Sequence, residues 1–200
     1  MNSQKFILAS ASPRRRELLE EAGYIFDIVP SGVDEEGFKS AGLTPAGYTE
    51  KLAGAKAEAV AEDYPDIPVL GSDCIVELEG EIFEKPEDGR DAERIIRTLF
   101  SSPHNVITSV AVVLRSGGRK SVRTAITRIY PAKLTQEQIS HHISTGKWRG
   151  RSGGYGVQDP HTEEYIEKIE GSFTNVVGLP MELTSEMLKE FGITPELQEN

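Results

Sequence analysis

The chain switches repeatedly between two spacings of apolar residues. Continuous or alternating apolar runs are typical of strands, whereas apolar residues that recur every three or four positions are typical of helices. Thr44 followed by Pro45 marks one helix start, because a hydroxyl N-cap and a proline in the first turn both favour it. For the N-terminal third we predict strands over 5–9 and 25–29, helices over 13–22 and 44–63, and a polar loop over 31–43.

Longer strands dominate the middle of the chain. The run at 69–76 is apolar on both alternating sides, as in a central strand, and Glu79-Gly80 predicts a tight turn after it. The other predicted elements are strands over 81–83, 104–115, 119–130 and 164–170 and helices over 89–100, 135–145 and 182–191. This alternation indicates an α/β fold in which helices flank an elongated, mixed, twisted sheet, in two lobes with a central cleft.

No segment resembles a linker, so we expect a single domain over residues 1–200. A domain of this length buries roughly 70% of its unfolded-chain surface, which makes disulfides or a structural metal unnecessary. The single cysteine, Cys74, excludes an intrachain disulfide and fits a reducing compartment. Since no apolar stretch has the length of a signal-peptide core or a membrane span, we expect a cytoplasmic protein that does not act at a membrane.

Charge changes this picture at one place. Acidic residues outnumber basic ones by 32 to 22, and the net charge of −10 counts against binding to nucleic acid polymers. The segment 10–16 nevertheless carries two serines, a proline and three consecutive arginines at a predicted strand-to-helix junction. Free backbone N–H groups and the helix dipole favour an anion there, so we expect a polyphosphate site. The alternative is a solvated basic face whose arginines pair with Glu17 and Glu20.

Two acidic residues are candidates for chemistry. Asp73 lies in an otherwise apolar strand after Gly71-Ser72, where the backbone can approach a ligand. Its carboxylate could hold Mg²⁺ against phosphate oxygens or accept a proton from an attacking water; the alternative is a structural aspartate at a strand end. Glu35, in the acidic cluster 34–36, is a candidate second ligand, although such clusters usually face solvent.

Further candidates are two lysines, the cysteine and one loop. Lys56 and Lys85 have apolar neighbours, so each is either merely solvated or a phosphate contact that neutralises a pyrophosphate leaving group. Cys74 is a nucleophile only in a less favoured interpretation, because no histidine is near it in sequence and a small buried thiol is more common. The loop 146–156 holds five glycines, three cations and two aromatics, a composition that is not expected of a core.

Five motifs spread over nearly the whole chain resemble the Maf family of nucleoside triphosphate pyrophosphatases. In family order they are Leu-Ala-Ser-Ala-Ser-Pro-Arg-Arg at 8–15, Gly-Ser-Asp at 71–73, Glu-Lys-Pro at 84–86, Gly-Gly-Tyr-Gly-Val-Gln at 153–158 and Asn-Val-Val-Gly-Leu-Pro at 175–180. The resemblance implies an elongated α/β fold similar to that of the inosine triphosphate pyrophosphatases. It also implies hydrolysis of a nucleoside triphosphate to the monophosphate and pyrophosphate, with Mg²⁺ or Mn²⁺.

The resemblance also implies roles for single residues. Asp73 falls on the family's catalytic acid and proton acceptor, and Asp73 and Glu35 fall on positions associated with the metal. The positions implied for phosphate binding are Ser10, Arg14, Arg15, Lys56 and Lys85. Arg14, Cys74 and Gln158 fall where the branch acting on dTTP and UTP selects its base.

The chain departs from that branch in two places. Cys74 stands where the branch has threonine, which loses a good hydroxyl donor. The stretch 147–153 replaces Glu-Pro-x-Asp-Lys-Ala-Gly, giving a more cationic loop in which Trp148 offers a stacking surface. Gln158, which both donates and accepts hydrogen bonds, keeps dTTP and UTP as the expected substrates. Stacking of Trp148 on a cationic base would instead favour 7-methyl-GTP.

Two other classes of function make different predictions. A nucleotide-sensing regulator of cell division, in line with the family's link to septum formation, binds a triphosphate without turning it over. A single-stranded nucleic-acid binder would use Trp148, Tyr155 and the neighbouring cations, against which the net charge of −10 argues. Exposed strand edges in an elongated fold would allow a homodimer.

Overall fold

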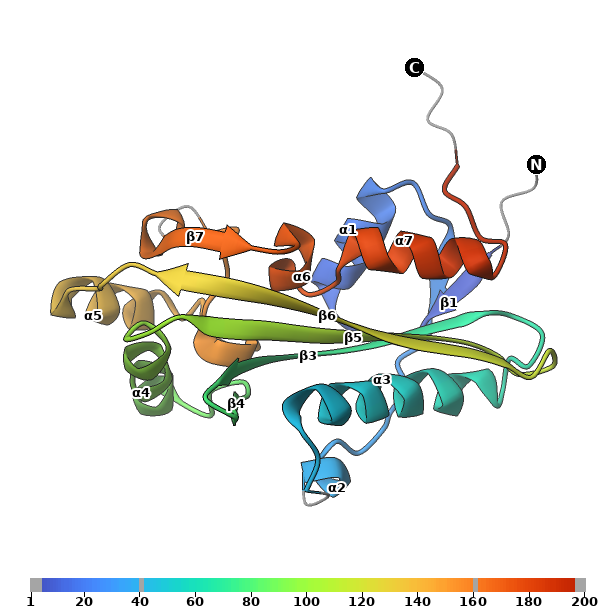
Figure 1. Cartoon of the computed structure of the whole chain (residues 1–200), viewed down its shortest axis with the longest axis horizontal. Helices are drawn as coiled ribbons and strands as arrows, with labels where there is room; N and C mark the ends of the chain where they lie inside the picture. Colours follow the sequence, from blue (N-terminus) through green and yellow to red (C-terminus); the bar gives the residue numbers. More distant parts are fainter. Residues whose placement is uncertain (1–4, 40–41, 160–161, 197–200) are drawn as a thin grey trace.

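The computed structural model describes residues 5–39, 42–159 and 162–196, which form a long sheet with helices on both faces (Figure 1). The strands are β1 (Phe6–Leu8), β2 (Phe26–Ile28), β3 (Val69–Leu78), β4 (Glu81–Phe83), β5 (His104–Leu114), β6 (Arg119–Pro131) and β7 (Ile166–Glu170). Their order is β2-β1-β3-β5-β6-β7, with β4 paired to β3. β1 is parallel to β2 and β3, and the other pairs are antiparallel, so the predicted mixed α/β sheet is confirmed.

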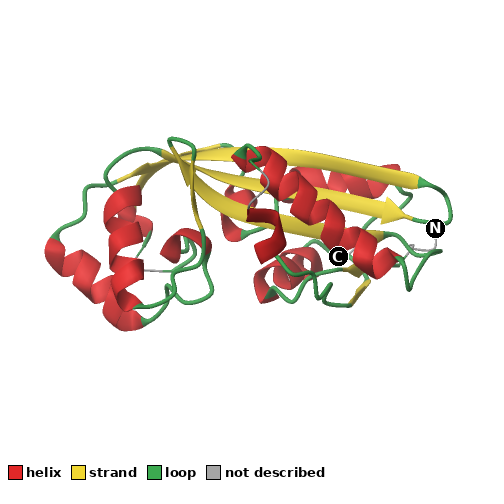
Figure 2. Ribbon diagram, turned by 90° about the horizontal axis from the view of Figure 1, so that it is seen from below, coloured by secondary structure: helices red, strands yellow, loops and turns green. Residues whose placement is uncertain are grey.

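The helices gather at the two ends of the long strands (Figure 2). They are α1 (Pro13–Glu21), α2 (Glu36–Lys39), α3 (Pro45–Ala61), α4 (Gly89–Leu99), α5 (Gln136–Thr145), α6 (Phe173–Val177) and α7 (Met181–Glu190), with single 3₁₀ turns η1 (Ser152–Gly154) and η2 (Glu163–Tyr165). At one end α3 covers one face of the sheet while α1 and α7 cover the other, and α4 and α5 lie at the opposite end (Figure 1). In the described part of the chain, no helix combines the length and apolarity that a bilayer crossing requires.

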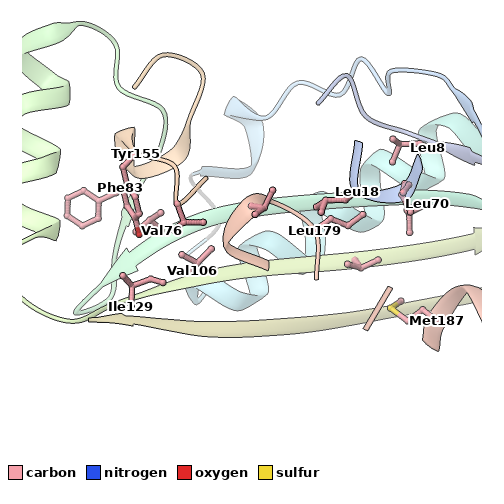
Figure 3. Packing of buried hydrophobic residues seen from close by; sticks show 14 of the residues in the cluster. Leu8, Leu18, Leu70, Val76, Phe83, Val106, Ile129, Tyr155, Leu179 and Met187 are labelled. Carbon is pink, nitrogen blue, oxygen red and sulfur yellow. The ribbon is translucent and has the colours of Figure 1, made fainter. Parts of the chain in front are cut away.

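One apolar core follows the sheet from end to end. Leu18 of α1 lies near Leu8 and Leu70 toward one end, and Phe83 and Tyr155 lie toward the other (Figure 3). All belong to the same cluster of buried side chains, so both groups of helices share it. On the opposite face, α3 packs through alanines against the strands, and small side chains let this helix lie close to the sheet.

Most predicted elements are confirmed within a few residues. Thr44 accepts a hydrogen bond from the N–H of Gly47 and caps α3 as expected. Glu79 and Gly80 have φ values of 54° and 88°, as in the hairpin turns that suit the twist of paired strands. Two short helices were not predicted. The expected loop 31–43 contains α2, and α6 lies where we expected only a turn and an extended segment.

The expectation that the loop 146–156 lies outside the core is wrong. Trp148 and Tyr155 are only 5% and 6% exposed, and the indole N–H of Trp148 donates to the carbonyl of Ile143 at 3.1 Å. Gly153 has φ of +71°, and a Cβ there would lie 2.7 Å from the Val76 side chain. The glycines therefore let this loop pack tightly against β3, and its aromatic side chains fill the core at that end.

Candidate active site

A cleft of about 710 Å³ opens beside the middle of β3. On one edge of this strand β1 pairs with Val69 and Leu70 and β4 pairs with Val76 to Leu78, whereas residues 71–75 have no strand partner there among the described residues. The predicted site residues that line the cleft are Ser10, Arg14, Arg15, Glu35, Lys56, Asp73, Cys74 and Lys85. Gln158 is exposed and is not among the lining residues, so the structure does not bring it to the other eight.

The cleft is cationic although the chain is acidic. The cations that line it are Arg14, Arg15, Lys56, Lys85, Arg149 and Arg151, and the carboxylates are Glu35, Asp73 and Glu84. In a protein of net charge −10, this local excess of positive charge attracts anionic ligands to one place.

The junction between β1 and α1 forms one end of the cleft. Ser10 Oγ accepts hydrogen bonds from the backbone N–H of Ser12 and from Arg15 Nη1, both at 3.2 Å. Arg15 Nη1 also donates to the carbonyl of Ser72 at 2.7 Å, and Nε donates to that of Gly178 at 3.0 Å. Arg15 thus fixes the junction against β3 and the end of α6, and the first turn of α1 faces the cleft.

The three consecutive arginines have different surroundings. Arg16 is exposed and lies 3.6 Å from Glu20, so the alternative of a solvated face describes this arginine. Arg14 is half-buried in the cleft. Burial and the like charge of Arg151 lower its pKa, while Asp159 and Glu17 act in the opposite direction. The guanidinium groups of Arg14 and Arg151 both line the cleft, and an anion or hydrogen-bond acceptor between them would relieve their repulsion.

Lys56 connects the two acidic candidates. Its Nζ lies 2.8 Å from Asp73 Oδ1 and 2.7 Å from Glu35 Oε1. Lys56 and Asp73 are 8% and 7% exposed, whereas the Glu35 side chain is 48% exposed. Burial alone would raise the Glu35 pKa, but the hydrogen bond and charge of Lys56, with Lys85 and Arg15, outweigh it and hold this pKa below its usual value.

Gly71 has a different role from the one predicted. We expected it to let a ligand approach the backbone, but the space above it is filled by α3. A Cβ on Gly71 would lie 2.4 Å from the carbonyl oxygen of Ala53 and 2.7 Å from the nitrogen of Ala57. This close contact holds α3 on β3, so Lys56 reaches Asp73 two residues further along the strand.

The two predicted metal ligands, Glu35 and Asp73, lie close together in the cleft. Among the described residues, no group of three or more histidine, cysteine or acidic side chains is arranged to hold a metal ion. Glu35 and Asp73 nevertheless converge on one ammonium group at the cleft floor. Mg²⁺ is commonly held by one or two carboxylates together with substrate phosphates and water, and this donor set fits such an ion.

Cys74 lies at the cleft but is a poor nucleophile. It directly faces Thr108 across the β3–β5 ladder and is partly exposed. Burial of its sulfur raises the pKa of the thiol, while Thr108, Arg15 and Arg14 lower it by less. Since the thiolate is the reactive form, the structure favours the interpretation of Cys74 as a small buried thiol rather than a nucleophile.

Tyr48 and Glu84 were not predicted as site residues. The Tyr48 hydroxyl donates to Glu84 Oε1 at 3.3 Å, and burial together with the Glu84 charge raises the Tyr48 pKa, so the phenol stays protonated. The pair separates the cleft from a neighbouring cavity of about 540 Å³. Tyr48 precedes Lys56 by about two helical turns on the same face of α3. This spacing is the signal in the sequence that places Tyr48 beside the site.

Arg151 was also not assigned a role, although its loop stood out. It forms a bidentate ion pair with Asp159, in which the Nη2–Oδ1 distance is 3.0 Å, and lines the same cleft as the phosphate junction. Trp148 in contrast is covered by Arg149, whose guanidinium carbon lies 4.5 Å from the indole centroid. Trp148 therefore does not offer the predicted stacking surface.

Comparison with known proteins adds to this geometry. A family described as "Maf-like protein" matches residues 5–191. A curated relative from Pelotomaculum thermopropionicum, named dTTP/UTP pyrophosphatase, is 41% identical over 189 residues, covering 94% of this chain and 97% of the relative. One of the same name from Chromobacterium violaceum is 40% identical, with 96% of each chain covered. Among solved structures, a HAM1 protein from Coxiella burnetii matches with a TM-score of 0.49 and 12% identity, over 94% of this chain and 99% of that one.

Proposed function

The chain belongs to the Maf-like protein family, and from this premise we propose that it is a nucleoside triphosphate pyrophosphatase acting on dTTP and UTP. The proposed reaction is attack of water on the α-phosphorus, with release of the nucleoside monophosphate and pyrophosphate. Relatives about 40% identical over nearly the full length are named dTTP/UTP pyrophosphatase, which supports both the reaction and the two substrates.

The observation that carries the proposal is the position of Lys56 between Asp73 and Glu35, beside a cationic junction. The junction 10–15 suits the triphosphate end of a nucleotide, because a helix N-terminus and arginines both favour phosphate oxygens. A triphosphate seated there brings its α-phosphorus toward Asp73 at the middle of β3.

Each residue then has a stated task. Asp73 accepts a proton from the attacking water as the oxygen bonds to the α-phosphorus and the bond to the bridging α–β oxygen breaks. Lys56 orients the Asp73 carboxylate through its 2.8 Å hydrogen bond. Arg14 and Lys85 stabilise the negative charge that develops on the departing pyrophosphate.

We also propose that Glu35 and Asp73 hold a divalent cation, Mg²⁺ or Mn²⁺. Such an ion, when bound, supplies positive charge to the phosphate oxygens and acidifies a coordinated water. Lys56 contacts both carboxylates and would compete with the ion for their oxygens. Removal of the metal with EDTA is expected to abolish turnover, and Mg²⁺ or Mn²⁺ is expected to restore it.

The choice of dTTP and UTP rests on the relatives rather than on Gln158, which lies away from the cleft. The buried position of Trp148 removes the observation that favoured 7-methyl-GTP. A cytoplasmic location and a homodimer stay predictions from the sequence.

The test is a product assay on purified protein with Mg²⁺ or Mn²⁺ over canonical and modified nucleoside triphosphates. We expect pyrophosphate from dTTP and UTP, and loss of at least about 100-fold in kcat for Asp73→Asn, as for a catalytic base. Asp66→Asn, at an exposed aspartate after α3, is the matched control and keeps full activity. Release of orthophosphate alone would contradict the proposal, and binding without turnover would support the regulatory alternative.

A further inference from the structure

We propose that Arg151 is a specificity-determining residue that donates a hydrogen bond to the C4 carbonyl oxygen of the uracil or thymine base. The inference rests on the proposed function, because it assumes that a pyrimidine triphosphate occupies the cleft. It assigns a role to the cationic loop after α5, which the proposed reaction leaves without one.

The β3 edge at residues 71–75, which has no strand partner among the described residues, binds two different segments of the chain in sequence order. The Ser72 carbonyl accepts from Arg15, which belongs to the phosphate junction, at 2.7 Å. Two residues later on the same edge, the Cys74 carbonyl accepts from Ser152 Oγ of η1 at 3.2 Å. The backbone N–H of Gly153 donates to the Glu84 carbonyl at 3.0 Å. The phosphate junction and η1 therefore bind neighbouring positions of one strand edge, one after the other.

This order fixes the direction of a bound nucleotide. With its phosphates on the junction at Ser72 and its α-phosphorus at Asp73, the nucleoside extends toward Cys74 and η1. Arg151, which begins η1 as its N-cap and lines the cleft, is the cation that the nucleoside meets there. Arg15 binds the Ser72 carbonyl, whereas Ser152 next to Arg151 binds the Cys74 carbonyl, so the two arginines belong to successive positions of this strand edge.

The guanidinium of Arg151 is held in one orientation. Both its ion-pair partner Asp159 and Arg151 itself are largely buried, with side chains 12% and 15% exposed. The absence of a side chain at Gly156 makes room for it, because a Cβ there would lie 2.3 Å from Arg151 Nη1. The bidentate pair uses two of the five N–H groups of the guanidinium, and among the described residues the other three have no hydrogen-bond partner, so they can bind ligand acceptors.

The charges around Arg151 favour an acceptor and disfavour a donor. The neighbouring Arg14 carries a like charge that acts on the same space, so Asp159 is one carboxylate beside two cations. Uracil and thymine present carbonyl oxygens at both C2 and C4, whereas cytosine presents an amino group at C4. An N–H donor that faces the C4 position therefore favours the keto bases over cytosine.

The test compares UTP with CTP in steady-state pyrophosphate release, and UMP with CMP in binding by calorimetry. We expect Arg151→Gln to lower the UTP-to-CTP ratio of kcat/KM by about 10- to 100-fold, as for loss of one charge-assisted hydrogen bond. The loss is expected mainly in KM, and the UMP-to-CMP affinity ratio is expected to fall with it. Arg151→Lys, which keeps the charge without the planar fork, is expected to lie between.

Arg149→Gln is the matched control. It removes one cation from the same loop and the same cleft, but from a side chain that stacks on Trp148. We expect it to weaken UTP and CTP equally, as a loss of general attraction does. An equal change of the two substrates in Arg151→Gln as well, or no change in that variant, would overturn the inference.

A second variant keeps the inference testable if Arg151→Gln does not fold. Gly156→Ala leaves Arg151 in the chain and displaces its guanidinium, so we expect the same fall in the UTP-to-CTP ratio. An unchanged ratio in a folded Gly156→Ala protein would contradict the inference. Failure of the proposed function looks different, because the wild-type protein would then release no pyrophosphate from either substrate.

Discussion

Lys56 is the residue that connects the two acidic candidates of the site. One ammonium group joins a carboxylate from a central strand to one from a loop that follows a different strand. Because Lys56 and Asp73 are both nearly buried, each requires the other, and removal of one leaves an uncompensated charge. The arrangement thus couples the position of Asp73, the proposed proton acceptor, to the stability of the fold.

Lys56→Met tests this coupling. The variant leaves Asp73 buried without its cation, so we expect the free energy of unfolding to fall by about 3–5 kcal/mol in urea denaturation. Lys189→Met, at an exposed lysine of α7, is the matched control and is expected to change it by less than about 0.5 kcal/mol. A loss below about 1 kcal/mol in Lys56→Met would show that the pair does not stabilise the site.

Glu35 predicts a specific dependence on pH. Its pKa in the folded protein is lowered from the usual value of 4.5, so its stabilising contribution is present above that value and is lost as the pH falls through the folded pKa. We expect the difference in Tm between wild type and Glu35→Gln to shrink from pH 6 to pH 3. The control Glu81→Gln, at an exposed position of β4, is expected to show a smaller change. An equal dependence in both variants would argue against the Lys56 contact.

At the scale of elements, the contact between α3 and β3 positions the chemistry. The helix crosses β3 at Gly71, and the same turn of the helix carries Lys56, which reaches Asp73. Asp73, the proposed proton acceptor, is therefore positioned by packing between two regular elements rather than by a loop. Small residues on both elements set the distance between α3 and β3.

Gly71→Ala is expected to disturb both stability and activity. The added methyl would overlap the backbone of α3, which cannot move aside as a flexible side chain does, so we expect a loss of about 1–3 kcal/mol in unfolding free energy. We also expect reduced kcat, because α3 carries Lys56. Gly37→Ala, in α2 with open space around the added group, is the control and should preserve both quantities.

The elements that the sequence predicts well are those whose signal is local. The strand at 69–76 and the turn at Glu79-Gly80 are marked by an apolar run and by turn residues, and both are confirmed. Helices α2 and α6 have four and five residues, too few for a helical period to appear. The role of Gly71 depends on a helix that approaches from elsewhere in the chain, and no local pattern contains that information.

Within the candidate site, motif residues were found and their partners were not. The cleft gathers eight of the predicted residues, but the sequence carries no sign that Arg15 binds the backbone of β3 or that Asp159 holds Arg151. Both contacts join segments through single hydrogen bonds or ion pairs, which leave no periodicity. The misplaced role of Trp148 has the same origin, because composition does not tell which aromatic residues of a glycine-rich loop turn inward.

At the scale of the whole molecule, three long strands are common to both groups of helices. β3, β5 and β6 run through the full length of the sheet, and one apolar cluster follows them (Figures 1 and 3). A local opening at either end would expose core that also supports the other end. We therefore expect the described fold to unfold as one cooperative unit.

The single tryptophan makes this expectation measurable. Trp148 is buried at the end that carries α4 and α5, so its fluorescence reports on that end, while far-ultraviolet circular dichroism reports on all helices. We expect the two thermal midpoints to agree within about 2 °C. Loss of the tryptophan signal well before that of the dichroism would show that this end opens independently.

The alternation of side chains along β3 places the proposed proton acceptor and the residues near the proposed nucleobase position on different faces of the sheet. Asp73 points toward α3 and Lys56, while the next residue, Cys74, has its side chain on the other face of the sheet. Substitutions around Cys74 and η1 therefore do not touch the hydrogen bond between Lys56 and Asp73, the proposed proton acceptor. Under the proposed function, residues beside the nucleobase can therefore vary while the contact between Asp73 and Lys56 is kept.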